Sequence, residues 1–139
     1  MATIVAYLTH QGNCREAMTF YKDCFGGELN LMTLGESPVG AQASAAEKDL
    51  IMHADLRSRS LRLMASDNLG GGVPVTMGTM INLMVYCDSE EEIRTIFPKL
   101  ARGGKVNSEL KVEFWGSLYG DITDRYGARW MLNYDMPKN

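Results

Sequence analysis

Residues 13–27, NCREAMTFYKDCFGG, predict an amphipathic helix whose start and end are both marked in the sequence. Asn13, followed three residues later by Glu16, forms the pattern of a capping box at a helix start. Apolar residues recur at helical spacing, namely Cys14, Ala17, Met18, Tyr21, Cys24 and Phe25. Gly26 and Gly27 supply the left-handed conformation that ends many helices. We therefore expect one helix here with a buried apolar stripe.

The same pattern returns in residues 89–104. Ser89 and Glu92 form the second capping box, and Gly103 and Gly104 form the second stop. The apolar stripe consists of Ile93, Ile96, Phe97 and Leu100, and Pro98 should bend the last turns. The apolar runs 4–8 and 81–85, which precede the two helices, are separated by the same number of positions as the glycine pairs. This repetition predicts two tandem modules of similar topology.

Short β-branched, aromatic or alternating segments predict the strands around these helices. In the first module, residues 1–67, the expected strands are 3–9, 28–34, 50–57 and 60–66, with a tight connection at 58–59 and a mobile flap at 35–48. Residues 68–78 hold four glycines and a proline and predict a linker. In the second module, residues 79–139, the expected strands are 79–87, 105–112, 119–123 and 129–134, with a turn at 124–127. Each module therefore has the order βαβββ.

One βαβββ module has too small a core to stand alone, so we expect the two sheets to pair around a shared cleft. The predicted fold is α+β, a single domain of 139 residues in which a cup-shaped mixed β-sheet carries its helices on the outside. With 14 basic and 17 acidic residues and no basic cluster, the chain has no electrostatic footprint for nucleic acid or an anionic membrane. A small molecule or another protein is the expected partner.

The three cysteines favour a reducing compartment, because their number is odd and Cys14 and Cys24 are too far apart on one helix for a disulfide. No CxxC spacing indicates a metal site or a redox site. The first ten residues lack the basic and apolar regions of a secretory signal, so we expect a cytoplasmic protein. Residues 68–87 are uncharged, but their glycines, Pro74 and Asn82 favour a loop that leads into a strand over a membrane span.

Several short motifs follow one another in a fixed order along the chain. They are GNC, FY and FGGEL around the first helix, then LMASDN, FWG and TDRYGARWMLNY. This set resembles the PhnB-like branch of the vicinal oxygen chelate superfamily, which contains glyoxalases, bleomycin-resistance proteins and extradiol dioxygenases. The resemblance implies the paired βαβββ fold, frequent homodimers and, in the enzymatic branches, a divalent metal held in the cup by four side chains. Some members of the branch are labelled demethylubiquinone methyltransferases, but this chain has no G-x-G-x-x-G fingerprint after a strand.

The alternation of side chains along a strand predicts which residues face the cup. The inward set comprises Ile4, Ala6, Leu8, His53, Asp55, Arg57, Arg62, Met64, Ser66, Met80, Asn82, Met84, Tyr86, Arg129, Met131 and Asn133. The set that packs on the helices includes Ile81, Leu83, Val85, Trp130 and Leu132. By the resemblance, the four metal-ligand positions fall near Ala6, Met64, Met80 and Met131.

Methyl and thioether groups are not ligands for zinc, nickel or iron, so these residues predict no metal cofactor and an adaptable apolar lining. A shift of one residue would exchange the faces, and a two-histidine site would then require His10 and His53 to converge.

Other polar and aromatic residues are candidates for ligand contact or catalysis. His53 and Asp55 share one face of a strand and could act as base and orienting group, or could simply be a polar pair bonded to neighbouring strands with help from Arg57 or Arg62. Arg62 and Arg129 could clamp a carboxylate or phosphate, or stay solvated. Trp115 and Tyr119 could close over a flat ligand, or pack in the core.

The leading hypothesis is a dimeric protein that binds a small molecule without a metal. The expected ligand-binding residues are His53, Arg62, Met64, Met80, Asn82, Trp115, Tyr119 and Met131. One rival is a metal-dependent lyase or dioxygenase, and another is an acid/base enzyme that uses His53 and Asp55. A third reading is an oligomeric or regulatory module whose cup is filled by its own side chains.

Overall fold

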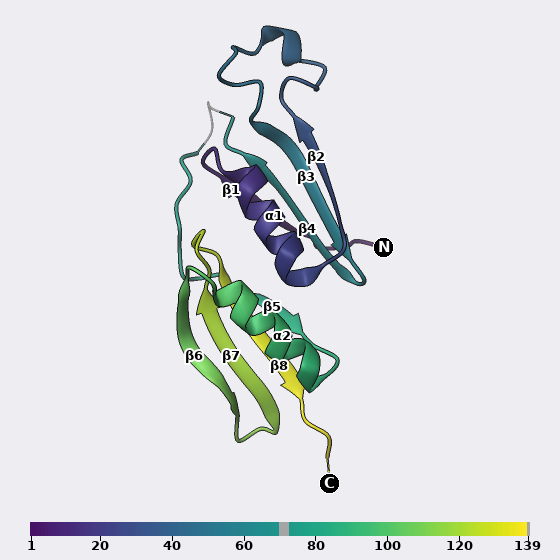
Figure 1. Ribbon diagram of the computed structural model, residues 1–139, viewed down its shortest axis with the longest axis vertical. Helices are drawn as coiled ribbons and strands as arrows, with labels where there is room; N and C mark the ends of the chain where they lie inside the picture. Colours follow the sequence, from purple (N-terminus) through teal and green to yellow (C-terminus); the bar gives the residue numbers. More distant parts are fainter. Residues whose placement is uncertain (70–72, 139) are drawn as a thin grey trace. The chain divides into compact units, whose positions relative to one another are not determined.

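The chain forms two compact units, Met1–Thr76 and Met77–Asn139, each with a four-stranded sheet and one α-helix (Figure 1). The structure is a computed structural model that describes residues 1–69 and 73–138. Part of the expected linker, residues 70–72, lies outside the described residues. None of the described helices is long and apolar enough to cross a membrane.

The first unit contains β1 (Ala6–His10), α1 (Cys14–Phe25), β2 (Glu28–Thr33), a short 3₁₀-helix η1 (Gly40–Gln42), β3 (Ile51–Ser58) and β4 (Leu61–Asp67). Its sheet has the order β1-β4-β3-β2. Strand β1 is parallel to β4, and the other neighbours are antiparallel. The parallel pair requires a long crossover between its strands, and α1 lies in that crossover.

The second unit repeats this arrangement. It contains β5 (Leu83–Tyr86), α2 (Glu90–Ala101), β6 (Lys105–Val112), β7 (Ser117–Thr123) and β8 (Arg129–Asp135). The order is β5-β8-β7-β6, with β5 parallel to β8. The predicted α+β fold of two tandem βαβββ modules is therefore confirmed.

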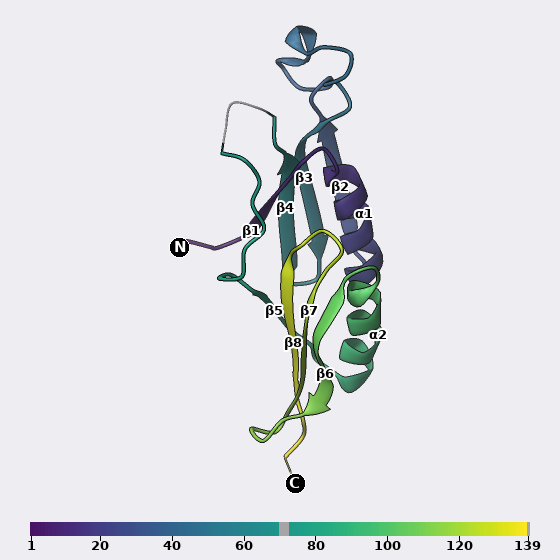
Figure 2. The ribbon, with the colours of Figure 1, turned by 90° about the vertical axis from the view of Figure 1, so that its left-hand side faces the viewer.

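Each helix covers one face of its own sheet, and the core of each unit lies between them (Figure 2). In the first unit, Met18 and Tyr21 of α1 and Leu56 of β3 are all 0% exposed. In the second, Ile93 and Leu100 of α2 and Leu132 of β8 are equally buried, among the other apolar residues of this layer. The opposite face of each sheet carries no helix of its own unit, and we call it the open face.

The two helices begin differently, although their sequences predict the same capping box. Ser89 accepts a hydrogen bond from the Glu92 backbone N–H at 3.0 Å, which confirms the cap of α2. Asn13 makes no such bond. The Asp67 carboxylate at the end of β4 takes its place and accepts from the Cys14 backbone N–H at 2.9 Å. The predicted capping box of α1 is therefore wrong, because a tertiary contact supplies the acceptor.

The first and fifth strands are shorter than predicted. Ile4, which was predicted to face the cup, precedes β1 and is 99% exposed. Ile81, which was predicted to pack under its helix, precedes β5 and is 70% exposed, so both predictions are wrong. Residues 35–48 contain η1 and are tied at their base, because Gly35 N–H donates to the Lys48 carbonyl at 3.0 Å. The mobility expected of this segment stays a prediction.

Candidate functional site

The open face of the first sheet is defined by the pairing of its strands. Tyr7 of β1 lies opposite Met64 of β4, Met64 lies opposite Asp55 of β3, and Asp55 lies opposite Asn30 of β2. Paired residues share a face, so these four side chains form one row across the sheet. His53 and Arg57 lie two residues to either side of Asp55 and share the same face.

The prediction that Ala6 and Leu8 face the cup is wrong. Ala6 lies opposite Leu63, and Leu8 lies opposite Ala65, both of which are buried on the helix side. Tyr7, 50% exposed, takes the place on the open face that was expected for Ala6. The cause is a shift of one residue in β1, which exchanges the two faces of a strand.

Asp55 is held by two arginines on the open face. Arg62 donates from Nε to Oδ1 at 3.2 Å and from Nη2 to Oδ2 at 3.0 Å, and Arg57 donates from Nε to Oδ2 at 3.2 Å. The hydrogen bonds from Arg62, followed by that from Arg57, hold the pKa of the Asp55 carboxyl below its ordinary value. Both carboxylate oxygens are thus occupied, and Asp55 remains ionised at neutral pH.

His53 lies beside Tyr7, with ring centroids 6.1 Å apart. No hydrogen bond joins His53 to Asp55 in the described part of the chain. The arrangement of a base oriented by a carboxylate, which residue spacing alone allowed, is therefore not formed. His53 instead borders an apolar area with Met32, its partner on β2, and Tyr7.

The two histidines of the chain lie on opposite faces of the first sheet. His10 pairs with Asp67 and continues the helix-side series of Ala6 and Leu8, whereas His53 is on the open face. Within the described residues no three His, Cys, Asp or Glu side chains are grouped to hold a metal ion. A site with two histidines and a carboxylate, which suits zinc or iron, does not fit this donor set.

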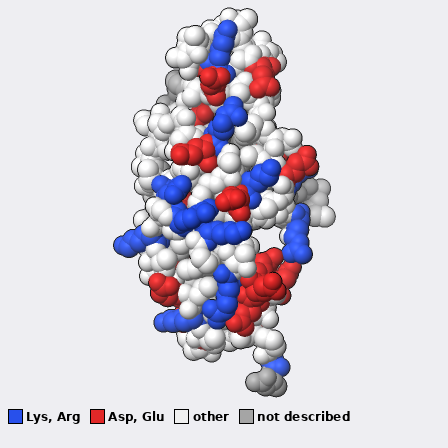
Figure 3. Space-filling model, viewed as in Figure 1, with Lys and Arg blue, Asp and Glu red and all other residues white. Residues whose placement is uncertain are grey.

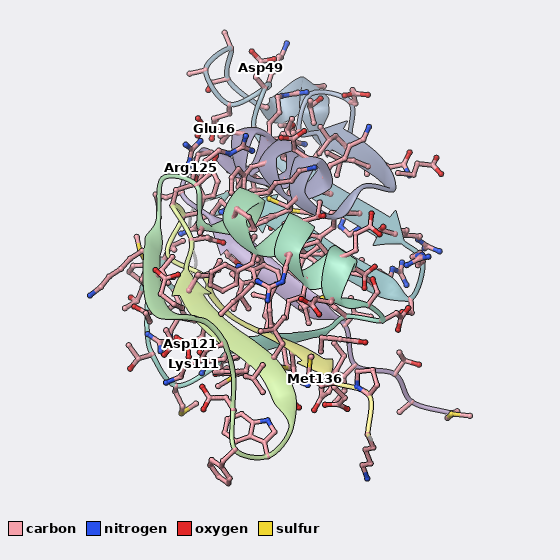
Figure 4. All side chains as sticks on the ribbon, turned by 60° about the horizontal axis from the view of Figure 1, so that its bottom comes forward. Glu16, Asp49, Lys111, Asp121, Arg125 and Met136 are labelled. Carbon is pink, nitrogen blue, oxygen red and sulfur yellow. The ribbon has the colours of Figure 1, made fainter. Side chains whose placement is uncertain are left out.

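The open face of the second sheet has a similar central row. Met84 of β5 lies opposite Met131 of β8, and Met131 lies opposite Asp121 of β7. Lys111 of the neighbouring strand β6 lies opposite Tyr119, two residues from Asp121 (Figure 4). Each unit therefore places a methionine of its last strand beside an aspartate of the strand before it.

Asp121 is occupied by a tyrosine. Tyr119 donates its hydroxyl to Asp121 Oδ2 at 2.9 Å. Burial, with this hydrogen bond and the Asp121 charge, raises the pKa of Tyr119 to about 12. The Tyr119 ring also meets Trp115 edge to face at 5.8 Å between centroids. Tyr119 therefore acts as a neutral hydrogen-bond donor and as a packing surface.

Of the remaining expected site residues, one is held by a hydrogen bond and two are exposed outside the strands. Asn82 Oδ1 accepts from Arg129 Nε at 3.0 Å, so these two residues restrain each other. Met80 precedes β5, is 89% exposed and lies on no strand face. Trp115 is 52% exposed in the turn between β6 and β7, next to Phe114 at 96%.

The structure brings together His53, Asp55, Arg62 and Met64 on the first open face, and Tyr119 and Met131 on the second. Sequence reasoning missed Tyr7 and Asp121. The position of Asp121 between Gly120 and Ile122 was an available signal, whereas β1 has no clear period that would have marked Tyr7.

Two motif aspartates have structural roles. Asp67 of LMASDN caps α1 and also accepts from the Ile51 N–H at 2.8 Å. Asp124 accepts from the backbone N–H of Tyr126 and Ala128 at 2.8 and 3.1 Å, and from the Trp130 indole at 2.7 Å. The motif TDRYGARWMLNY therefore builds the turn before β8 through Asp124.

All three cysteines are free and buried. Burial, reinforced by Asp67, raises the pKa of Cys14 to about 12, and burial with Glu92 and Asp88 does the same for Cys87. These two thiols are poor nucleophiles. Figure 3 shows an acidic group over the start of α2, where Glu90, Glu91 and Glu92 form the first turn. This group complements the helix dipole.

Comparison with known proteins agrees with this fold. The sequence profile of the Glyoxalase/Bleomycin resistance protein/Dioxygenase superfamily matches residues 5–132. Protein YjdN of Escherichia coli (strain K12) is 32% identical over 136 residues, covering 91% of each chain.

Among solved structures, protein PA1353 from Pseudomonas aeruginosa has a TM-score of 0.84 and 39% identity, covering 99% of this chain and 100% of its own. A PhnB protein from Bacillus cereus, described as a putative 3-demethylubiquinone-9 3-methyltransferase, has a TM-score of 0.74 and 26% identity, covering 96% and 99%. The chain belongs to the glyoxalase/bleomycin resistance protein/dioxygenase superfamily, with a PhnB protein among its relatives.

Proposed function

We propose that this protein binds a small molecule on the open faces of its sheets and does so without a metal ion. The observation that carries the proposal is the placement of His10 and His53 on opposite faces of the first sheet, while Asp55 is held by two arginines. The face where metal ligands are expected in catalytic relatives thus carries Met64 and Tyr7. Thioether and aromatic groups form an adaptable apolar surface for a ligand.

The expected binding residues fall into one group per unit. In the first unit they are His53, Arg62 and Met64, and we add Tyr7 because it lies opposite Met64 on the same face. In the second they are Asn82, Trp115, Tyr119 and Met131. Arg62 in the first set, and Asn82 and Tyr119 in the second, are restrained by hydrogen bonds, which lowers the entropy that ligand binding would cost. Met80 could join the second group only if residues before β5 move toward the sheet.

Native mass spectrometry of the full chain, purified without chelators, tests the proposal directly. We expect no stoichiometric metal, either as purified or after addition of Ni²⁺, Zn²⁺, Fe²⁺ or Mn²⁺. One tightly bound ion per chain that is lost in His53→Ala and kept in His10→Ala would refute metal-free binding. A co-purified organic adduct that is lost in Met64→Asp, while the variant keeps its fold by circular dichroism, would support it.

The rival acid/base function receives less support from the geometry. A general base must reach the proton that it removes, and its orienting group must contact it. Asp55 contacts arginines, and the neighbour of His53 is an aromatic ring. Turnover of any substrate that disappears in His53→Ala would reverse this judgement.

We also propose a homodimer in the cytoplasm. Edge strands β1 and β5 each have one bonded neighbour in the described sheets and expose Tyr7, Met84 and Tyr86 at 50%, 43% and 67%. Exposed apolar edges favour association. Light scattering should give twice the chain mass of 15.4 kDa, and a monomer mass would contradict the dimer.

The cytoplasmic location is supported by the three free cysteines, which suit a reducing compartment.

A further inference from the structure

We propose that the ligand of the first open face carries an oxyanion, a carboxylate or a phosphate, joined to a flat apolar body. This inference rests on the proposed function and specifies the chemical class of the ligand. It follows from the paired arginines at one end of the face and the aromatic and thioether groups beside them.

Two guanidinium groups meet on one carboxylate. Arg57 lies directly opposite Arg62 on the antiparallel strands β3 and β4, and both donate to Asp55. Like charges opposite each other on a sheet normally repel. Asp55, with a side chain 15% exposed, offsets that repulsion and holds both guanidinium groups in place. The three groups together carry one net positive charge.

The arginines keep unused donors that can reach a ligand. Each guanidinium has five N–H donors, and the bonds to Asp55 use only part of them. The side chains of Arg57 and Arg62 are 61% and 39% exposed. Glu28 lies opposite Arg57 at the sheet edge, but no ion pair joins these two in the described residues. A guanidinium fork that is already oriented suits a carboxylate or phosphate oxygen pair.

The neighbouring surface is apolar and partly flat. Met64 follows Arg62 by two residues on β4, so it lies about 7 Å further along the same face. Tyr7 lies opposite Met64, and the His53 ring is 6.1 Å from the Tyr7 ring. An anion bound at the arginines would therefore place an attached ring over Met64, against the Tyr7 and His53 rings.

The candidate arginine of the other unit, Arg129, lacks this arrangement. Arg129 donates to the Asn82 amide oxygen, a neutral partner, and lies opposite Thr123. It was an equal candidate for anion binding on sequence grounds, and it now provides a matched control.

The test compares 2-naphthoate with its neutral analogue 2-naphthamide by isothermal titration and by backbone amide NMR of the full chain. Wild type should bind the acid about tenfold or more tightly than the amide, as charged hydrogen bonds imply. Arg62→Gln should reduce this preference to near unity, Arg62→Lys should retain part of it, and Arg129→Gln should leave it intact. NMR shifts should fall on Tyr7, His53 and Met64. If Arg62→Gln fails to fold, Arg57→Gln should show the same loss.

Three results would overturn the inference as a whole, and a fourth would overturn its apolar part. The first is equal affinity for acid and amide, which leaves small-molecule binding itself standing. The second is a preference that survives both arginine substitutions. The third is no binding of either compound at millimolar concentration, which refutes this ligand class. The proposed metal-free binding of a small molecule is tested separately, by native mass spectrometry. Inorganic phosphate that binds as tightly as 2-naphthoate would refute the apolar part.

Discussion

Asp67 links three segments of the first unit through one buried carboxylate. Its side chain is 3% exposed and accepts from the backbone N–H groups at the start of α1 and of β3. An asparagine offers only one acceptor oxygen there and turns an N–H₂ group toward the second donor. Asp67→Asn should therefore lower the free energy of unfolding by about 2–4 kcal/mol.

The control for this substitution is Asn13→Ala, because Asn13 occupies the cap position without forming the cap bond. Urea unfolding should show a change below about 0.5 kcal/mol for Asn13→Ala, as for an ordinary surface site. A larger loss for Asn13→Ala than for Asp67→Asn would mean that the local capping box forms after all.

Asp55 should make stability depend on pH in a defined direction. Its folded pKa is depressed by Arg62 and Arg57, so its contribution is fully present above the ordinary aspartate pKa of about 3.9 and is lost as the pH falls through the depressed value. Urea unfolding of wild type and Asp55→Asn should differ most near neutrality, and the two should converge in acid. A difference that grows as the pH falls would contradict the arginine pairing.

The helices show how far local sequence predicts an element. The end of α1 follows from its glycines, because Gly26 and Gly27 have φ angles of 75° and 92°, which other residues avoid. The start of α1 depends on Asp67, which is distant in sequence and could not be found from the cap pattern. The phase of β1 was also inaccessible, since AYLTH mixes apolar and polar residues without a clear period.

For the candidate site, the sequence predicted which face of a strand a side chain occupies better than it predicted the hydrogen-bond partners of that side chain. Strands β4 and β8 have a strict alternation, so the faces of Met64 and Met131 were predicted correctly. The bonds from Arg62 and Arg57 to Asp55 agree with the alternative in which Asp55 is a polar residue bonded to its neighbours. The bond from Arg129 to Asn82 was not predicted, because side-chain partners on neighbouring strands depend on register.

The two glycines that end α1 should respond differently to alanine. A Cβ at Gly26 would meet nothing within 4 Å, so Gly26→Ala should cost only backbone strain, about 1–3 kcal/mol. A Cβ at Gly27 would collide with the Arg57 carbonyl oxygen and with Ser58 Cβ at 2.6 Å. Gly27→Ala should therefore cost about 1–3 kcal/mol more than Gly26→Ala in chemical unfolding. Equal losses would show that the β3–β4 hairpin yields without cost.

At the scale of the whole molecule, the two units share one topology but differ in the use of their open faces. In each, a methionine lies opposite an aspartate, yet Asp55 is bound by two cations and Asp121 by a neutral tyrosine. The repeated βαβββ unit thus has the same layer between helix and sheet in both halves, while the central aspartates of the open faces have partners of different charge. Our proposed anion ligand belongs to the first face alone.

The placement of the histidines predicts that the folded chain gains no stability from a divalent ion. A ligand that binds only the folded state at 1,000 times its Kd adds about 4 kcal/mol to the free energy of unfolding, so a metal in the fold would show clearly. Thermal unfolding of the full chain should be unchanged by EDTA dialysis and by later addition of Zn²⁺ or Ni²⁺, because the two histidines lie on opposite faces of the first sheet. His53→Ala should unfold in the same way with and without metal. The contrary result is an unfolding midpoint that falls on dialysis and recovers with one ion in wild type, but not in His53→Ala. It would mean that His53 is a metal ligand. The other ligands would then be side chains whose hydrogen bonds in this structure must break.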